Sequence, residues 1–246
     1  MMHSQIRAGG GRLGQLSGWL RRGLDLLFPP RCVACSQVGS WFCVACQTSV
    51  ERVSPPICSH CGQPLPPSVT GPLCSRCRTT SLPLDGIRSV AIHDGALRHA
   101  IHHLKYRHRR ELADTLGRLL AAYWQEANLP ADLVIPVPLH AGRMEERGYN
   151  QAALLARGLV AHIPLAVNET DFIRTRETSP QVGLGASERV SNVRDAFAWV
   201  GDELDGASVL LIDDVCTTGS TLGACALPLR QAGVGSVWAL TLARAR

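Results

Sequence analysis

The chain has 246 residues, 46% of them hydrophobic, which is enough for one α/β domain and a smaller module. Its 25 Lys and Arg residues against 20 Asp and Glu give a net charge of +5, which favours anionic ligands but is too small an excess to mark a nucleic-acid-binding protein by itself. No apolar stretch approaches the about 18 residues that a membrane span needs, so we expect a soluble globular protein.

The first segment, residues 1–27, is predicted to be a basic amphipathic helix. Its first 24 residues contain four arginines and no acid, and leucines at helical spacing would share one side. The same composition superficially suits an organellar transit peptide, which is the alternative. The hydrophobic cluster around residues 24–28 is interrupted by Asp25, so we expect no secretory signal.

Eight of the ten cysteines form four C-x-x-C pairs within the first 80 residues. Each pair presents two thiolates from one tight turn, and two pairs complete the tetrahedral sulfur cage that zinc prefers. We therefore predict a double zinc-ribbon module over residues 28–80 with two structural zinc ions. The predicted ligands are Cys32, Cys35, Cys43, Cys46, Cys58, Cys61, Cys74 and Cys77.

The pairing of these cysteine pairs stays open, since the first can share a zinc with the second or, in a crossed arrangement, with the third. Redox chemistry and disulfides are the rivals of metal binding. A redox motif would be one reactive pair near a βαβ unit rather than four in a Pro-rich segment, and disulfides would call for a secretory signal. The module has little apolar content, so the metals would supply much of its folding free energy.

From about residue 85 the C-x-x-C pairs cease, and strand-like and helical segments alternate, which indicates a βαβ domain over residues 85–246 after a linker near residues 79–84. Residues 87–92 are predicted to form a strand, and residues 97–104 and 112–123 to be helical. Four histidines lie among arginines in this helical region, at His99, His102, His103 and His108. We interpret them as a solvated face rather than a metal site, because no carboxylate partner is evident.

Two basic loops follow. Residues 133–140 read as a short buried strand that runs into a Pro-punctuated loop, and Arg143 and Arg147 come next, before another helix. The Gly, Ser, Pro and Arg content of residues 174–197 suits a mobile loop, and its cations Arg174, Arg176 and Arg189 are candidates to close over a pyrophosphate.

The most informative stretch is residues 209–221. Residues 209–212 read as a buried strand, so Asp213 and Asp214 would lie at its carboxyl end, where open α/β sheets bind ligands. The hydroxyls and backbone N–H groups that follow, at the start of a helix, suit a phosphate. They belong to Thr217, Thr218, Gly219, Ser220 and Thr221. The prediction is a ribose phosphate whose 5′-phosphate faces the threonines.

An ordinary strand, an Asp-rich turn and an N-capped helix would explain each of these residues singly, but not their order. Pro228 is expected to kink or shorten the helix after Thr221. Cys216 and Cys225 are interpreted as small packing residues rather than nucleophiles.

Residues 209–221 resemble the 5-phosphoribosyl 1-pyrophosphate (PRPP) signature of the type I phosphoribosyltransferases. Together with the C-x-x-C series and residues 101–106, 136–139, 147–151 and 181–192, they make the chain similar to the ComF family from about residue 28 to residue 242. The resemblance implies a type I phosphoribosyltransferase fold, a parallel sheet flanked by helices, with an N-terminal Cys-rich zinc module.

The resemblance also implies roles for single residues. Asp213 and Asp214 would hold the ribose hydroxyls, with Mg²⁺ bound together with PRPP, and residues 217–221 would hold the 5′-phosphate. Candidates for neutralising pyrophosphate are Arg143, Arg147, Arg174, Arg176 and Arg189, with Lys105 as a further one. The catalytic set would be Asp213, Asp214, Arg174 and Arg189.

The family is associated with DNA uptake in natural transformation and implies a cytoplasmic protein. We therefore expect a phosphoribosyltransferase that releases pyrophosphate from PRPP, although nothing in the chain identifies the acceptor. The alternative is a non-catalytic accessory protein that senses PRPP or binds single-stranded DNA, with a competence helicase as a further partner.

Overall fold

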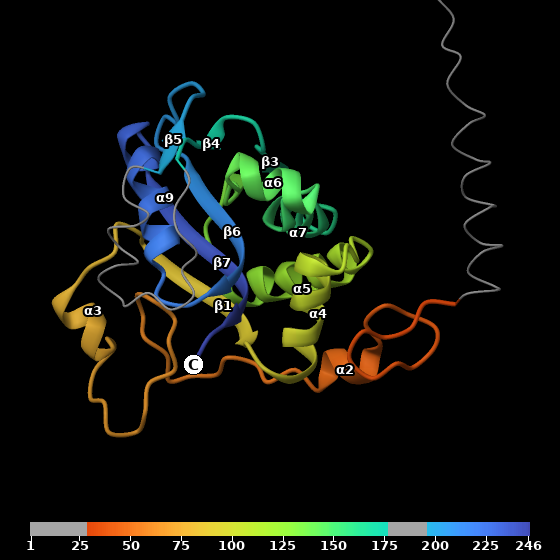
Figure 1. Cartoon of the computed structure of the whole chain (residues 1–246). Helices are drawn as coiled ribbons and strands as arrows, with labels where there is room; N and C mark the ends of the chain where they lie inside the picture. The colour runs from red at the N-terminus through yellow and green to blue at the C-terminus, as the bar shows by residue number, and fades with distance from the viewer. Residues whose placement is uncertain (1–28, 177–195) are drawn as a thin grey trace, which may run out of the picture.

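The computed structural model describes residues 29–176 and 196–246, which form a parallel sheet with helices on both faces (Figure 1). Five strands lie in the order β1-β7-β6-β2-β3, and every neighbouring pair is parallel. Their bounds are Gly86–Ile92 (β1), Leu133–Pro136 (β2), Ala166–Val167 (β3), Ser208–Cys216 (β6) and Ser236–Arg244 (β7). A separate antiparallel pair joins β4 (Phe172–Arg174) and β5 (Phe197–Trp199). The predicted α/β class is confirmed.

Two short helices, α2 and α3, precede β1, and the other helices of the described residues occupy connections between the strands. Their bounds are Val44–Thr48 (α2), Ser75–Thr79 (α3), Gly95–Tyr106 (α4), Leu112–Ala127 (α5), Ala141–Arg147 (α6), Gln151–Val160 (α7) and Ser220–Gln231 (α9). α4 begins where the carboxylate of Asp94 accepts a hydrogen bond from the Gly95 N–H at 2.8 Å, an N-cap that satisfies one of the first free amides. The helices predicted over residues 97–104 and 112–123 are confirmed as α4 and α5.

Each face of the sheet has its own hydrophobic core. Leu210 and Ile212 of β6 pack with α4, α5 and α7, whereas Val209 and Leu211, which alternate with them, pack with α9. Figure 1 shows the same division, with α9 on one side of β6 and β7 and with α4, α5 and α7 on the other. A strand covered on both faces is apolar throughout, which explains the continuous run at residues 209–212.

β6 is longer than the sequence predicts, because the predicted strand ends at residue 212 and β6 continues through both aspartates to Cys216. β7 holds this extension, since Asp213 pairs with Thr241 and Cys216 pairs with Arg244 across the ladder. Successive side chains of a strand point to opposite faces, so the two carboxylates diverge at the strand end.

Two further expectations are corrected. The sequence predicts a loop around Arg143 and Arg147, but the structure forms α6 there, which ends at Gly148 in the left-handed conformation (φ +71°). Of the two effects expected of Pro228, the shortening does not occur, since α9 continues to Gln231 with Ala226 and Leu229 buried in the core, and the kink stays a prediction.

The Cys-rich segment runs along the exposed edge of β1. Residues 51–53 pair with this edge strand through hydrogen bonds from Val53 N to Val90 O (3.1 Å) and from Ile92 N to Glu51 O (2.8 Å). The contact covers backbone groups that an edge strand otherwise leaves open. Figure 1 shows α2 near α4 and α3 at the other end of this segment. The boundaries at residues 28–80 and 85–246 stay predictions, as does the helix over residues 1–27, which lies outside the described residues.

Candidate functional site

A cavity of about 550 Å³ opens where the strands end. His93 follows β1, Val137 follows β2 and Ala245 follows β7, while Asp213 and Asp214 lie near the end of β6, so the carboxyl ends of four parallel strands surround one space. Its other lining residues are Lys105, Tyr106, Pro138, Leu139, Arg143, Gln151, Arg174, Val215, Cys216, Thr217, Gly219, Ser220, Thr221 and Leu222.

The two aspartates have different surroundings. The side chain of Asp214 is 4% exposed, and its Oδ1 lies 2.6 Å from Nζ of Lys105 on α4. Burial and the neighbouring charge of Asp214 raise the pKa of Asp213 to about 7. Oδ2 of Asp214 is buried without a hydrogen-bond partner among the described residues. Buried carboxylate oxygens are rarely left unsatisfied, so this oxygen fits a ligand hydroxyl or a cation.

Lys105 has a defined role in this geometry. Burial by itself would lower the pKa of Lys105, but the charge and the hydrogen bond of Asp214 raise it, so the ammonium group stays charged. The lysine thus compensates the buried carboxylate and lines the cavity at the same time. It is tied to Asp214 before any anion binds.

The loop between β6 and α9 forms the end of the cavity. Gly219 is the N-cap of α9 with φ +78°, and a Cβ atom there would lie 2.7 Å from Cδ1 of Ile87, so the turn requires glycine. The hydroxyls of Thr218 and Ser220 share a hydrogen bond of 2.7 Å. The start of a 12-residue helix with adjacent hydroxyls provides N–H donors and positive dipole charge for an anion.

The predicted cations divide into three groups. Arg143 and Arg174 line the cavity. Arg147 and Arg176 do not line the cavity, and neither does Thr218 of the predicted phosphate-binding residues. Arg147 is 9% exposed and contacts two residues that do line it, since it donates a hydrogen bond to Oε1 of Gln151 and its guanidinium lies 5.2 Å from the Tyr106 ring centroid. Arg189 and the predicted loop at residues 181–192 lie outside the described residues, so their roles stay predictions.

The lining residues that were not predicted as site residues include three with hydrogen-bonding side chains, namely His93, Tyr106 and Gln151. Burial first, and then the charge of Lys105, lower the pKa of His93, which leaves a neutral imidazole at the end of β1. The rule that placed Asp213 would also have found His93, because it directly follows the predicted strand at residues 87–92. No comparable signal marks Gln151, which reaches the cavity through the start of α7.

The two further cysteines behave as packing residues. Cys216 is 2% exposed, and burial raises its pKa to about 11. Cys225 is fully buried on α9, and burial also raises its pKa well above the ordinary value. Both sulfurs are therefore neutral thiols near pH 7, which does not suit a nucleophile.

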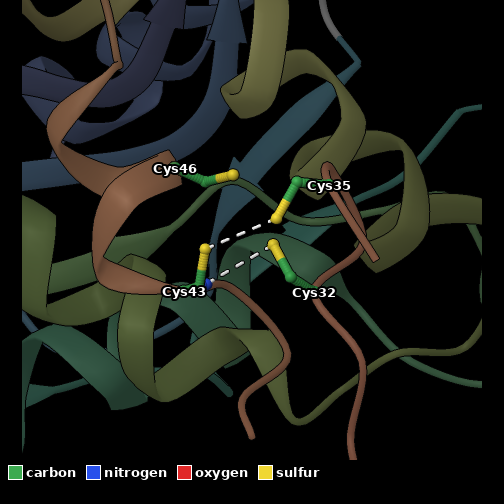
Figure 2. A group of neighbouring side chains, drawn as sticks. All are labelled: Cys32, Cys35, Cys43 and Cys46. Atoms are coloured by element: carbon green, nitrogen blue, oxygen red, sulfur yellow. Dashed lines mark hydrogen bonds between the residues drawn. The ribbon is translucent and has the colours of Figure 1, made fainter. Parts of the chain in front are cut away.

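The other eight cysteines form two clusters, and they pair sequentially. Cys32, Cys35, Cys43 and Cys46 make the first cluster, and Cys58, Cys61, Cys74 and Cys77 make the second; within each, the four sulfurs lie within 4.8 Å of one another. Figure 2 shows the sulfurs of the first cluster pointing toward a common centre, with Cys46 contributed by α2. The crossed pairing is excluded.

The sulfur spacing fits zinc. A tetrahedral site with Zn–S bonds of about 2.3 Å places its sulfurs about 3.8 Å apart. Sγ of Cys35 and Cys43 are 3.6 Å apart, and Sγ of Cys61 and Cys74 are 3.7 Å apart, far beyond a disulfide bond of about 2.05 Å. Burial would raise the pKa of Cys32, but hydrogen bonds from backbone N–H groups outweigh it and lower the pKa to about 6, whereas burial and the neighbouring thiols raise the pKa of Cys46 in the same cluster.

The histidines of α4 and the turn after it form no comparable cluster. Across residues 29–176 and 196–246, only the two cysteine groups bring three or more potential metal ligands together. His99, His102 and His108 are exposed, as a solvated face predicts, whereas His103 is half-buried and its Nδ1 has no hydrogen-bond partner among the described residues. Within the same ranges, no helix combines the length and the apolar character that crossing a membrane requires.

The chain is similar to known proteins over most of its length. A double zinc ribbon domain matches residues 23–78. Competence protein F of Haemophilus influenzae is 32% identical over 227 residues, which cover 87% of this chain and 97% of that protein. DNA utilization protein YhgH of Escherichia coli K12 is 32% identical (89% and 99% covered), and Competence protein ComFC of Bacillus subtilis is 29% identical (82% and 83%).

Solved structures match about half of this chain, and more weakly. A glutamine PRPP amidotransferase from B. subtilis is 22% identical with a TM-score of 0.36, and the match covers 52% of this chain and a quarter (25%) of that longer one. A hypoxanthine phosphoribosyltransferase from Staphylococcus aureus is 17% identical with a TM-score of 0.34, covering 55% and 64%. Likenesses at this level carry no argument about activity, which has to be inferred from the geometry of the cavity.

Proposed function

The chain belongs to the ComF family of competence proteins, and from this premise we propose that it binds PRPP in the cavity at the end of β6 and transfers the phosphoribosyl group to an acceptor. The observation that carries the proposal is that one cavity is lined by Asp213 and Asp214, by the hydroxyl-rich start of α9 and by the cations Arg143 and Arg174. A ribose with phosphate groups at both ends requires these same three kinds of polar group.

Each part of the ligand has a suitable partner. The N–H groups and hydroxyls of residues 217–221 suit the 5′-phosphate, because a helix start and hydroxyl donors stabilise a dianion. The carboxylates suit the ribose hydroxyls, which donate hydrogen bonds where a phosphate would be repelled. Arg143 and Arg174 suit pyrophosphate, since guanidinium groups bind phosphate oxygens through paired hydrogen bonds.

The cavity also suits the electrostatics of phosphoribosyl transfer. Positive charge grows on the ribose ring as the bond to pyrophosphate breaks, and the carboxylates of Asp213 and Asp214 stabilise it. Negative charge grows on the leaving group, where the arginines neutralise it. Magnesium bound with PRPP would add charge neutralisation at the pyrophosphate oxygens, and the unpartnered Oδ2 of Asp214 is an oxygen ligand of the kind that Mg²⁺ prefers.

The names of the relatives, competence protein and DNA utilization protein, support a role in competence and in the use of DNA. We propose that the protein acts in the same process. The acceptor is the open part of the proposal. His93, which lines the cavity, is a neutral imidazole available to accept a proton from an incoming nucleophile.

Calorimetric titration of PRPP with Mg²⁺ into the zinc-loaded protein tests the binding step. We expect binding that Asp213→Asn or Asp214→Asn weakens at least tenfold, while Glu203→Gln, an exposed acid outside the cavity, changes nothing. Pyrophosphate release is then measured with a panel of purine and pyrimidine bases. Binding without release by any base would make the protein a PRPP sensor, and absence of binding would refute both forms.

A second candidate function rests on a different surface. Between Asp94 and Glu111 the chain has no acidic residue, and α4 with the turn to α5 exposes cationic and imidazole side chains. We call this the α4–α5 basic surface; its residues are Arg98, His99, His102, Arg107, His108, Arg109 and Arg110. Tyr106, 57% exposed, joins it to the cavity that it also lines.

This surface suits a single nucleic-acid strand. None of its arginines forms an ion pair with a carboxylate in the described ranges, so their charges are available to phosphates. An exposed tyrosine beside a basic groove is a stacking platform for bases. The candidate binding surface for single-stranded DNA is therefore α4–α5 rather than the cysteine module. Electrophoretic mobility of labelled oligothymidylate with and without the protein tests whether a strand binds, and substitution of the arginines of this surface tests where it binds.

A further inference from the structure

The second cysteine cluster lies against the loop that forms the end of the cavity. The contact is made by Arg244 at the carboxyl end of β7, which is 1% exposed. Nη1 of Arg244 donates hydrogen bonds to the carbonyl oxygen of Cys61 (2.8 Å) and to Sγ of Cys216 (2.9 Å), and Nη2 lies 3.7 Å from Sγ of Cys61. One side chain thus bridges a predicted zinc ligand and the last residue of β6, from which the β6–α9 loop begins.

A buried guanidinium requires a negative charge nearby. Burial of its positive charge without compensation is costly. No carboxylate forms an ion pair with Arg244 in the described parts of the chain. Four thiolates around one Zn²⁺ carry a net charge of −2, so the loaded second cluster supplies the missing anion through Cys61.

A second contact joins the same two parts. Arg76 lies between Cys74 and Cys77, and its guanidinium donates a hydrogen bond to the carbonyl oxygen of Thr218. The hydroxyl of Thr218 in turn shares a hydrogen bond with the hydroxyl of Ser220, the first residue of α9. The cluster therefore contacts the loop at both flanks, at Cys216 through Arg244 and at Thr218 through Arg76.

The backbone around the cluster is fixed to the sheet beneath the loop. The Ile87 N–H donates to the carbonyl oxygen of His60 at 2.8 Å, and a Cβ atom on Gly62 would lie 2.4 Å from the Ile87 carbonyl oxygen. Nε2 of His60 accepts a hydrogen bond from the Leu82 N–H at 3.2 Å. Leu82 in turn packs against Gly219, since a Cβ atom on Gly219 would lie 3.1 Å from Cδ1 of Leu82. A shift of the cluster would therefore displace the loop.

The first cluster is placed differently. Cys32, Cys43 and Cys46 share a hydrophobic core with Leu97 and Ile101 of α4. Arg109 stacks on Trp41 of this module, with its Cζ 4.4 Å from a ring centroid. Among the described hydrogen bonds and ion pairs, none joins the first cluster to residues 216–221.

From these contacts we infer that the second zinc site, acting through Arg244 and Arg76, holds the β6–α9 loop in its anion-binding geometry, whereas the first zinc site only stabilises the fold around α4. Arg244 and Arg76 are positioning residues, since neither lines the cavity. The ligand side of this inference rests on the proposed PRPP function, but the ordering of the loop does not.

Hydrogen exchange of the zinc-loaded full chain, followed by mass spectrometry of a peptide that covers residues 213–224, tests the inference without any ligand. We expect Arg244→Gln and Arg76→Gln each to speed exchange in this peptide at least fivefold, and Arg109→Gln, which removes the arginine that stacks on Trp41 of the first module, to leave it unchanged. Arg76 is less buried than Arg244, so it remains informative if Arg244→Gln does not fold. Unchanged exchange in a folded Arg76 variant, or an equal effect of Arg109→Gln, overturns the inference.

Cadmium substitution gives the ligand-side readout. With ¹¹³Cd at both sites, the resonance that Cys58→Ser abolishes should shift when PRPP and Mg²⁺ are added, and the resonance that Cys32→Ser abolishes should not. If calorimetry shows PRPP binding while neither resonance moves, the coupling is wrong and the proposed function stands. If PRPP does not bind but the exchange result holds, the proposed function fails and the positioning role stands.

Discussion

Nζ of Lys105 lies 2.6 Å from Oδ1 of Asp214, so a helix residue from the first βα unit compensates a carboxylate at the end of β6. The side chains are 20% and 4% exposed, which makes this the most buried ion pair of the described residues. Since little water reaches the pair, removal of the lysine would leave a buried carboxylate without a compensating charge.

Removing this lysine should destabilise the protein. We expect Lys105→Met to lower the free energy of unfolding by about 3 kcal/mol, because breaking a buried pair leaves one charge uncompensated. Arg118→Met is the control, since its pair with Asp114 is 61% exposed on both sides and is worth at most about 0.5 kcal/mol. Urea unfolding measures both. Equal effects of the two substitutions would contradict the importance of burial, and adding Asp214→Asn to Lys105→Met should restore part of the stability.

Asp213 should make stability depend on pH. Its pKa is raised to about 7, above the ordinary value of 3.8, so the folded state binds more protons than the unfolded state between these values. The contribution of Asp213 is therefore fully present below about pH 4 and is lost as the pH rises to 7. We expect Asp213→Asn to gain melting temperature relative to the wild type as the pH rises from 5 to 8. A constant difference between the two proteins would show that Asp213 has an ordinary pKa.

The turn before α9 should depend on glycine at one position. Gly219→Ala combines a left-handed backbone with a Cβ 2.7 Å from Ile87, whereas Gly233→Ala has a similar φ of +82° and nothing within 4 Å. We expect about 1 kcal/mol of destabilisation for Gly233→Ala from backbone strain and about 1–3 kcal/mol more for Gly219→Ala. Only Gly219→Ala should also weaken PRPP binding. Matching effects in thermal unfolding would mean that the loop yields to the added methyl group.

These predictions depend on contacts between residues far apart in the sequence, and the sequence identifies only one partner of each contact. Four apolar residues before two aspartates predict a strand and a ligand site, because few other arrangements bury such a run. The continuation of β6 to Cys216 depends on β7, a nine-residue strand between β1 and β6 that we did not predict. Local patterns likewise placed Lys105 on a helix, but its pairing with Asp214 depends on how α4 packs on the sheet.

The cysteine spacing has the same limit. The C-x-x-C pairs identified every ligand of both clusters, since two thiolates three residues apart suit one metal whatever surrounds them. The choice between sequential and crossed pairing depends on the path of the chain, which leads the first two pairs to α4 and the last two to the start of β1. That path is set by tertiary contacts such as the pairing of residues 51–53 with β1.

The two metal sites should differ in the rate at which they release zinc. Cys35 of the first cluster is exposed, whereas all four cysteines of the second cluster are buried. A chelator reaches a thiolate–metal bond through its exposed ligand, so we expect a faster phase from the first site and a slower one from the second. Zinc release monitored with a colorimetric chelator should lose its fast phase in Cys32→Ser and its slow phase in Cys58→Ser. Disappearance of the slow phase in Cys32→Ser would reverse the assignment.

The α4–α5 basic surface should determine how DNA binding depends on salt. Removal of one arginine–phosphate interaction reduces the slope of log affinity against log salt by about 0.7 for a single strand. Replacement of Arg107, Arg109 and Arg110 by Gln should therefore flatten the slope by about 2 between about 50 and 200 mM salt. The control replaces Arg52, Arg118 and Arg157, which removes the same charge from arginines already paired with carboxylates. Fluorescence anisotropy of labelled oligothymidylate gives both slopes. An equal flattening of the slope in the control would show that DNA binding depends on the net charge of the protein rather than on this surface. Weakened binding in cysteine variants alone would show that DNA binds to the zinc module instead.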